Sequence, residues 1–151
     1  MSMFNVSMDN RQLNEVYLFH LEKAYKQFRK RKTEFFKQAG IDITSDQWVL
    51  LKSIEEEEGI NQQELARKAF KEPASVTRIL DILEKKGWVR RQAMENNRRA
   101  YALFVTEQGK ALVQRILPLA AAIRAEGVAG MSEEEEAQLR RLLIRLYENF
   151  S

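Results

Sequence analysis

The stretch from Asn61 to Arg99 constrains this chain most, because its local signals predict a short helix, a turn, a second helix and two basic strands in that order. Asn61 is a good N-cap, and Glu64 three residues later is placed to complete a capping box. Pro73 is tolerated only in the first turn of a helix, so the second helix begins there. Gly87 ends that helix after two lysines, where the macrodipole favours cations. The order predicts a helix-turn-helix followed by a hairpin.

The predicted second helix has two unlike faces. One face is an apolar stripe with i, i+3, i+4 and i+7 spacing. The other face has the small and hydroxyl side chains that permit close approach to DNA, and an arginine that can pair bidentately with guanine. An ordinary surface helix would also have one apolar face, so the helix alone leaves both interpretations open. The apolar residues are Val76, Ile79, Leu80 and Leu83, and the outer residues are Ala74, Ser75, Thr77, Arg78, Asp81 and Lys85.

Residues 88–93 and 101–105 are aromatic and β-branched enough to be strands, and the polar run MENNRR between them predicts a hairpin. The first strand carries Arg90, and the tip carries Arg98 and Arg99. Arginine gains from the enhanced negative potential of a narrow minor groove. A cationic hairpin directly after a helix-turn-helix therefore favours a DNA-contacting wing over a solvated surface hairpin.

Charge is segregated along the chain, although the net charge of +3 is modest. Residues 61–110 contain eleven Lys or Arg and six Asp or Glu, a local balance of 11 − 6 = +5. The acidic clusters at 55–58 and 133–136 lie outside that region. A local excess of cations of this kind is typical of a surface that faces DNA.

The run from Thr44 to Leu117 resembles the MarR family of bacterial winged helix-turn-helix transcription regulators. The matching pieces stand in family order and at family spacing, and they read DQWVLL, NQQELARKAF, SVTRILDILEKKGWVRR, NRRA and VTEQGKAL. One departure is that Met94 and Asn97 stand where the family's wing usually has Asp. The Asp at the position of Asn97 commonly orients the arginine that matches Arg99, and a neutral Asn makes a weaker bond.

The resemblance implies a mainly α fold with a small two-stranded β-wing, a winged helix-turn-helix flanked by N- and C-terminal dimerisation helices. We expect residues 1–40 to hold the N-terminal dimerisation helix, 41–108 the DNA-binding domain and 109–151 the C-terminal dimerisation helices. Long helices are predicted from about 10 to 38 and 107 to 129, and a last one after Ser132. Their apolar stripes indicate a partner, which in this family is a second copy.

The implied function is that of a homodimeric repressor that binds double-stranded DNA at a pseudo-palindromic operator, with recognition helices about 34 Å apart. The expected DNA-contacting residues are Ala74, Ser75, Thr77, Arg78, Lys85, Arg90, Arg98 and Arg99. The alternative is a winged-helix module that binds proteins without specific DNA readout. The cations of the wing and Arg78 discriminate against it, because a pure interaction module has no need to concentrate them there.

Relatives of this kind often bind a small aromatic effector between the dimer helices and the DNA-binding lobe. Aromatic residues at helical spacing are equally typical of plain core, so that alternative stays open. The basic and aromatic pattern of residues 23–37 also allows a membrane-surface or nucleic-acid-binding helix, although its helical spacing favours a core-facing stripe with a solvated basic back. The candidates for an effector crevice are Tyr17, His20, Phe28, Phe36 and Trp48.

No enzymatic function is expected, and neither a cofactor nor a metal. The sequence has no glycine-rich phosphate loop, nucleophile elbow or HExxH, and the single His20 is not in a ligand cluster. There is no cysteine, which excludes disulfides and thiolate metal sites and suits a reducing compartment. No apolar run approaches the roughly 20 residues of a membrane span, and no signal-peptide core is found, so we expect a cytoplasmic protein without a membrane partner.

Overall fold

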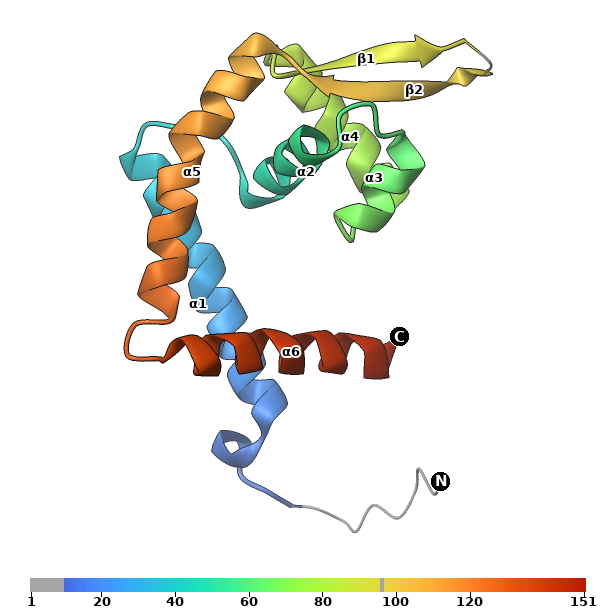
Figure 1. Ribbon diagram of the computed structural model, residues 1–151. Helices are drawn as coiled ribbons and strands as arrows, with labels where there is room; N and C mark the ends of the chain where they lie inside the picture. The colour runs from blue at the N-terminus through green and yellow to red at the C-terminus, as the bar shows by residue number, and fades with distance from the viewer. Residues whose placement is uncertain (1–9, 96) are drawn as a thin grey trace. The chain divides into compact units, whose positions relative to one another are not determined.

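The computed structural model describes residues 10–95 and 97–151, and the side chains of residues 97–99 lie outside that description. The chain forms two compact units, of which one ends at Ile41 and the other begins at Asp42. The described residues form α-helices and one two-stranded antiparallel sheet, so the predicted mainly α class with a β-wing is confirmed. The elements of Figure 1 are η1 (Leu13–Glu15), α1 (Tyr17–Gln38), α2 (Ser45–Glu56), α3 (Gln62–Lys68), α4 (Pro73–Lys85), β1 (Val89–Met94), β2 (Asn97–Val105), α5 (Glu107–Gly127) and α6 (Glu133–Phe150).

The first unit contains η1 and α1, and the prediction of one unbroken helix from about residue 10 to residue 38 is wrong at its start. Val16 is extended, with φ −99° and ψ 116°, and separates the single 3₁₀ turn from α1. Two local interactions favour this break. Gln12 and Glu15 form a capping box around η1, and His20 Nε2 donates to the carbonyl oxygen of Asn14 at 2.7 Å. These side-chain bonds stabilise the non-helical turn in competition with a continuous helix.

Helix starts in the second unit follow the capping residues of the sequence. Thr44 and Gln47 form a capping box at α2, and Asn61 Oδ1 accepts from the Glu64 N–H at 2.8 Å at α3. The return bond predicted from the Glu64 side chain is not present among the described residues, so the cap of α3 is half of the predicted box. Asn61 also pairs with Ala102 of β2 in an isolated antiparallel bridge, beside a bond from the Leu103 N–H to the Ile60 carbonyl at 3.0 Å.

The core of the second unit lies where α2, α3 and α4 meet the base of the hairpin (Figure 1). The apolar stripe of α4 is buried as predicted, with Val76, Leu80 and Leu83 inaccessible and Ile79 half-buried. Burial of such side chains is the main favourable contribution to folding, at roughly 1.5–3 kcal/mol for each. The other fully buried residues are Leu50, Leu51, Ile54, Leu65, Val89, Leu103, Val113 and Ile116.

The connection from α4 to β1 is a tight C-cap. Gly87 has φ +79°, and the Trp88 N–H donates to the Leu83 carbonyl at 3.0 Å, which is the long bond of a Schellman motif. Trp88, predicted as the first strand residue, therefore belongs to the turn, and β1 begins at Val89. The cap directs the chain from α4 straight into β1.

The second strand is longer than the sequence predicts. It begins at Asn97 rather than Tyr101, so the backbone of Arg98 and Arg99 lies in β2 and not in a loop at the tip. The register runs from Val89 opposite Val105 to Ala93 opposite Tyr101, with an irregularity between Ala93 and Met94. Beyond the irregularity Met94 pairs with Asn97, so pairing at the end of the hairpin sets where β2 begins, although the polar residues there have little strand propensity of their own.

The last two helices begin at predicted caps. The Thr106 hydroxyl accepts from the Gly109 N–H at the start of α5, and Ser132 and Glu135 form a capping box at α6. None of the 18 described residues of α6 is buried, and its apolar side chains form an exposed stripe. Within the described residues, no helix is both long and apolar enough to cross a membrane. The exposed residues of the α6 stripe are Leu139, Leu142, Leu143 and Phe150, with Leu146 half-buried.

Candidate nucleic-acid interface

The outer face of α4 presents the residues predicted to contact DNA. Ala74, Thr77 and Arg78 are exposed in the first half of the helix, and Ser75 is half-buried. Lys85 is exposed in the last turn. Because the opposite face is packed in the core, the helix can offer only this side to a ligand. The helix therefore presents small, hydroxyl and cationic groups on one rigid surface.

Arg78 is the side chain of this face best suited to base readout. Its Nη2 donates to the Ser75 hydroxyl at 3.3 Å, one turn earlier on the helix. This bond uses one of the five N–H groups of the guanidinium. Within the described part of the chain Arg78 has no carboxylate partner, so its remaining donors are available to a nucleic acid. Ser75 thus orients the arginine.

Thr77 is more constrained than the sequence suggests. Its hydroxyl donates to the Pro73 carbonyl at 3.1 Å and accepts from Gln62 Nε2 at 2.7 Å. Gln62 is the first residue of α3, so this bond links the two helices of the motif at their N-terminal ends. The role of Gln62 is not predictable from the sequence, because Gln62 and Thr77 are fifteen positions apart and no local signal connects them. Glutamine is also a side chain that pairs bidentately with adenine.

Arg91 attaches the wing to α4. Its Nη2 donates to Asp81 Oδ1 at 2.7 Å, and its Nε lies 3.5 Å from Glu84 Oε2. The Nε is buried and makes no hydrogen bond, so the contact with Glu84 is electrostatic only. The Arg91 side chain is 21% exposed and is therefore partly shielded from water. Asp81, predicted on the outer face, serves as the anchor of β1.

Arg90, one residue earlier on the same strand, is the exposed cation of the wing that the structure describes. Its guanidinium lies 4.4 Å from the centroid of the Phe104 ring on β2, and its Nη1 donates to Gln92 Oε1 at 3.2 Å. The stacking holds the charge flat against the hairpin surface, where a phosphate can approach it. The side chains of Arg98 and Arg99 lie outside the described residues, so their minor-groove role stays a prediction.

The predicted effector residues are divided between the two units. On α1, Tyr17, His20 and Phe28 are exposed and Phe36 is buried. Trp48, on α2, is buried in the second unit. The effector crevice therefore stays a prediction. The described residues contain no group of three His, Asp or Glu side chains placed to hold a metal ion.

Comparison with known proteins agrees with this architecture. The profile of the MarR family matches residues 43–101, from just before α2 into β2. The structure of a mutant MarR from Escherichia coli in complex with operator DNA is 26% identical, covers 91% of this chain and 99% of its own, and gives a TM-score of 0.79. A probable transcriptional regulator from Pseudomonas aeruginosa is also 26% identical, with coverages of 89% and 99% and a TM-score of 0.79.

Over residues 43–101 this chain is similar to the MarR family of transcriptional regulators. A third MarR-like structure is Bordetella bronchiseptica BpsR, whose DNA binding is regulated by 6-hydroxynicotinic acid. It is 18% identical over 92% of this chain and 98% of its own, with a TM-score of 0.84, and at that identity it supports the fold alone. The winged helix-turn-helix fold that the sequence predicts is therefore confirmed.

The ion pairs of Arg91 give a prediction about the stability of the protein. We expect Arg91→Met to lower the free energy of unfolding by about 1 kcal/mol, discounted for the exposure of both carboxylates. The reason is that Asp81 and Glu84 would lose their shared cation. Urea unfolding followed by circular dichroism measures the change. Lys110→Met is the control, because its pair with Glu107, at 3.6 Å, is exposed and should contribute nothing measurable. If Arg91→Met and Lys110→Met unfold at the same urea concentration, the ion pairs of Arg91 do not stabilise the attachment of the wing to α4.

Proposed function

We propose that this chain is a sequence-specific, double-stranded DNA-binding regulator of transcription that acts as a homodimer. The observation that carries the proposal is the exposed polar face of α4 with Arg78 oriented on it and the basic wing fixed to the same helix by Arg91. The ion pair of Arg91 thereby keeps the exposed side chains of α4 and the wing in fixed positions relative to each other. The E. coli relative bound to operator DNA supports the same use of the fold.

The two parts of the surface have different roles in this proposal. Ser75, Thr77 and Arg78 enter the major groove, and Ala74 permits the helix to approach closely. Arg98 and Arg99 reach the adjacent minor groove. Lys85 and Arg90 contact phosphates, which adds affinity without specificity.

The homodimer follows from the apolar surface that the flanking helices expose. Tyr17 and Leu21 on α1 are exposed, as is the α6 stripe defined above. Exposed apolar stripes of this kind usually mark an interface. We therefore assign residues 1–40 and 109–151 to dimerisation and residues 41–108 to DNA binding. Two-fold symmetry places the two recognition helices about 34 Å apart on a pseudo-palindromic site.

Repression and release by a ligand complete the proposal. A repressor bound at the operator blocks transcription. An effector weakens DNA binding if it binds more tightly to a dimer conformation in which the two recognition helices do not have the spacing of the half-sites. Regulation of BpsR by 6-hydroxynicotinic acid supports an aromatic effector in a protein of this fold. We propose no catalytic role, and we expect the protein to act in the cytoplasm, where bacterial DNA lies.

Arg78 provides the test of the major-groove assignment. Arg78→Ala is expected to cost roughly 1–3 kcal/mol at a selected duplex and to relax base preference at one position of each half-site. Lys85→Ala is the matched control, and it should weaken all sequences about equally and reduce the salt slope by about 1. Fluorescence anisotropy on the selected duplex and its single-base variants measures both effects. The role assignment is wrong if the two variants lose affinity in the same sequence-independent way.

A further inference from the structure

The hydrogen bonds of Thr77 determine what its hydroxyl can offer to a ligand. A hydroxyl has one O–H donor and two acceptor lone pairs. The Thr77 donor is used by the Pro73 carbonyl at 3.1 Å, and one lone pair accepts from Gln62 Nε2 at 2.7 Å. Thr77 therefore has no proton left for a phosphate or for the major-groove edge of guanine, because both present only acceptors. It keeps one lone pair and its methyl group.

The same bonds set the orientation of the Gln62 side-chain amide. Because the only proton of the Thr77 hydroxyl goes to Pro73, the Gln62 atom that faces Thr77 must be the donor, the amide nitrogen. Nε2 then keeps one N–H, and Oε1 keeps both lone pairs. Neither atom has another partner among the residues that the structure describes. Thr77 is exposed on the outer face of α4 and Gln62 is half-buried, so this free edge of the amide lies at the candidate interface.

A donor and an acceptor side by side match one base edge in the major groove. Adenine presents the N7 acceptor next to the N6 amino donor, and a glutamine amide pairs with both. Guanine presents two acceptors, thymine an acceptor and a methyl group, and cytosine a donor, so each leaves one atom of the amide unpaired. A phosphate presents acceptors only, and Oε1 would face it without a bond. An unpaired polar group in an interface costs free energy, so the amide selects adenine.

We propose that Gln62 is a specificity-determining residue that pairs with an adenine in each half-site, and that Thr77 is the positioning residue for its amide. The inference rests on the proposed function and deepens it, because it extends base readout from α4 to α3. The surface that enters the major groove then includes both helices of the motif, joined by the bond of 2.7 Å. Arg78 reads a separate base, because its guanidinium is oriented by Ser75 instead.

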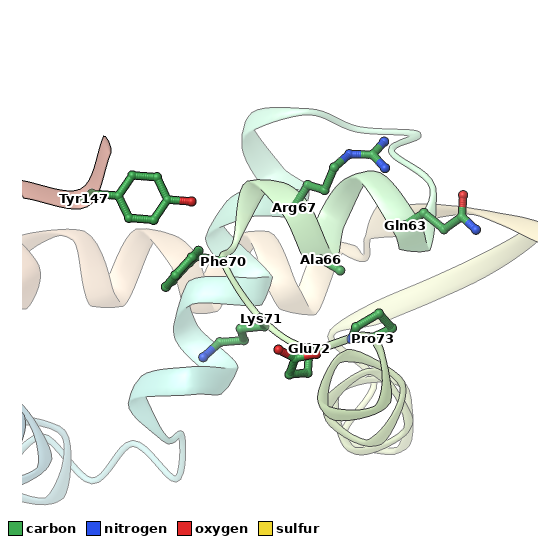
Figure 2. A pocket seen from close by; sticks show the side chains of 8 residues that line it. All are labelled: Gln63, Ala66, Arg67, Phe70, Lys71, Glu72, Pro73 and Tyr147. Carbon is green, nitrogen blue, oxygen red and sulfur yellow. The ribbon is translucent and has the colours of Figure 1, made fainter. Parts of the chain in front are cut away.

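Gln63 is the matched control that the chain itself provides. It is the same residue type at the next position of α3, and it is exposed. Its side chain extends away from Pro73 at the start of α4 and lines a pocket with Phe70 and Tyr147 (Figure 2). It makes no side-chain hydrogen bond with any residue in the described part of the chain. An effect that depends on the bond to Thr77 must therefore be absent at Gln63.

The test measures base preference on a duplex that the parent protein selects from a random library. Fluorescence anisotropy gives the dissociation constants of that duplex and of the three base-pair substitutions at each position. Gln62→Ala is expected to lower the preference for adenine by at least about fivefold at one position of each half-site, with the other positions unchanged. Gln62→Glu should shift that position toward cytosine, because a carboxylate only accepts and the cytosine N4 amino group donates. Gln63→Ala should leave every preference unchanged.

The positioning role of Thr77 has a readout of its own. Thr77→Val keeps the shape of the side chain and removes the hydroxyl, so adenine preference at the Gln62 position should fall by about the same factor. The double variant Gln62→Ala/Thr77→Val should lose no more at that position, because residues that act as one unit are not additive. Thr77→Ser keeps the hydroxyl and should keep the preference. In NMR spectra of the free protein, Thr77→Val should shift a Gln62 side-chain amide proton, and Gln63→Ala should not.

An equal loss of affinity by Gln62→Ala on every duplex would overturn the inference, because it would indicate a backbone contact or a packing role. Adenine preference that persists in Gln62→Glu or in Thr77→Val would overturn it as well. If circular dichroism shows that Gln62→Ala does not fold, Gln62→Glu decides the question. If the parent recovers a motif and Arg78→Ala relaxes it while the Gln62 variants keep their preferences, this inference fails and the proposed function stands. If the parent recovers no motif, both fail.

Discussion

Leu142→Glu is expected to dissociate the proposed homodimer and, with it, to abolish tight binding to a two-fold operator. Leu142 lies on the α6 stripe and is 50% exposed, so a carboxylate there is tolerated by the free chain. In an interface it would be buried without a partner, which typically costs about 3–5 kcal/mol. A cost of about 3 kcal/mol weakens association more than a hundredfold. Loss of the dimer also removes the second half-site contact, so operator affinity should fall by at least about tenfold.

Arg141→Glu is the matched control for this change. Arg141 is the adjacent residue on the polar face of the same helix and is exposed, and its replacement makes a larger change in net charge. Sedimentation velocity across a range of protein concentrations measures the dimer, and anisotropy on the selected duplex measures DNA binding. We expect the control to remain dimeric and to bind as the parent does. If the Leu142→Glu variant remains dimeric, the dimer interface does not include the α6 stripe at Leu142.

Gly109→Ala is expected to lower the free energy of unfolding by about 2–3 kcal/mol, the upper part of the range for an overpacked site. A Cβ added at Gly109 would lie 2.2 Å from the Trp88 carbonyl oxygen and 2.7 Å from Val105 Cγ1. The first of these is backbone, so it cannot move aside as the end of a flexible side chain can. Because Gly109 has no side chain, α5 can begin directly against the backbone of Trp88, in the turn that leads into the wing. The Gly109 N–H also donates to the Thr106 hydroxyl that caps α5.

Gly127→Ala is the control, since it lies in the same helix and its added Cβ meets nothing within 4 Å. Alanine should stabilise that position by up to about 1 kcal/mol, because it is the better helix former. Urea unfolding of both variants gives the comparison. If Gly109→Ala unfolds at the same urea concentration as the parent, the close packing of α5 on the Trp88 backbone is not what the structure describes.

The parts of the fold predicted from sequence are those that local side chains specify. Pro73 marks the start of α4, and Gly87 marks its end because only a residue at ease with positive φ closes that turn. Thr106 and Ser132 cap α5 and α6 for the same local reason. The apolar stripe of α4 identified its buried face, and thereby the outer face that carries the candidate site.

The parts that were not predicted depend on contacts between distant residues. Arg91 has the same sequence signature as Arg90, yet it pairs with α4 while Arg90 stacks on the wing. The bond from Gln62 to Thr77 and the contact of Phe70 with Tyr147 exist only once the helices have packed. Propensity and periodicity describe one element at a time, so they cannot distinguish a structural arginine from one that faces a ligand.

The most direct test of the proposed function is selection of duplexes from a random library by the purified protein, with the recovered sites measured again across a range of salt concentration. We expect a two-fold motif with half-sites about one helical turn apart, and an affinity that falls steeply as salt rises. Weak binding without a recoverable motif would contradict specific readout by α4 and the wing. The winged helix would then act through protein contacts instead.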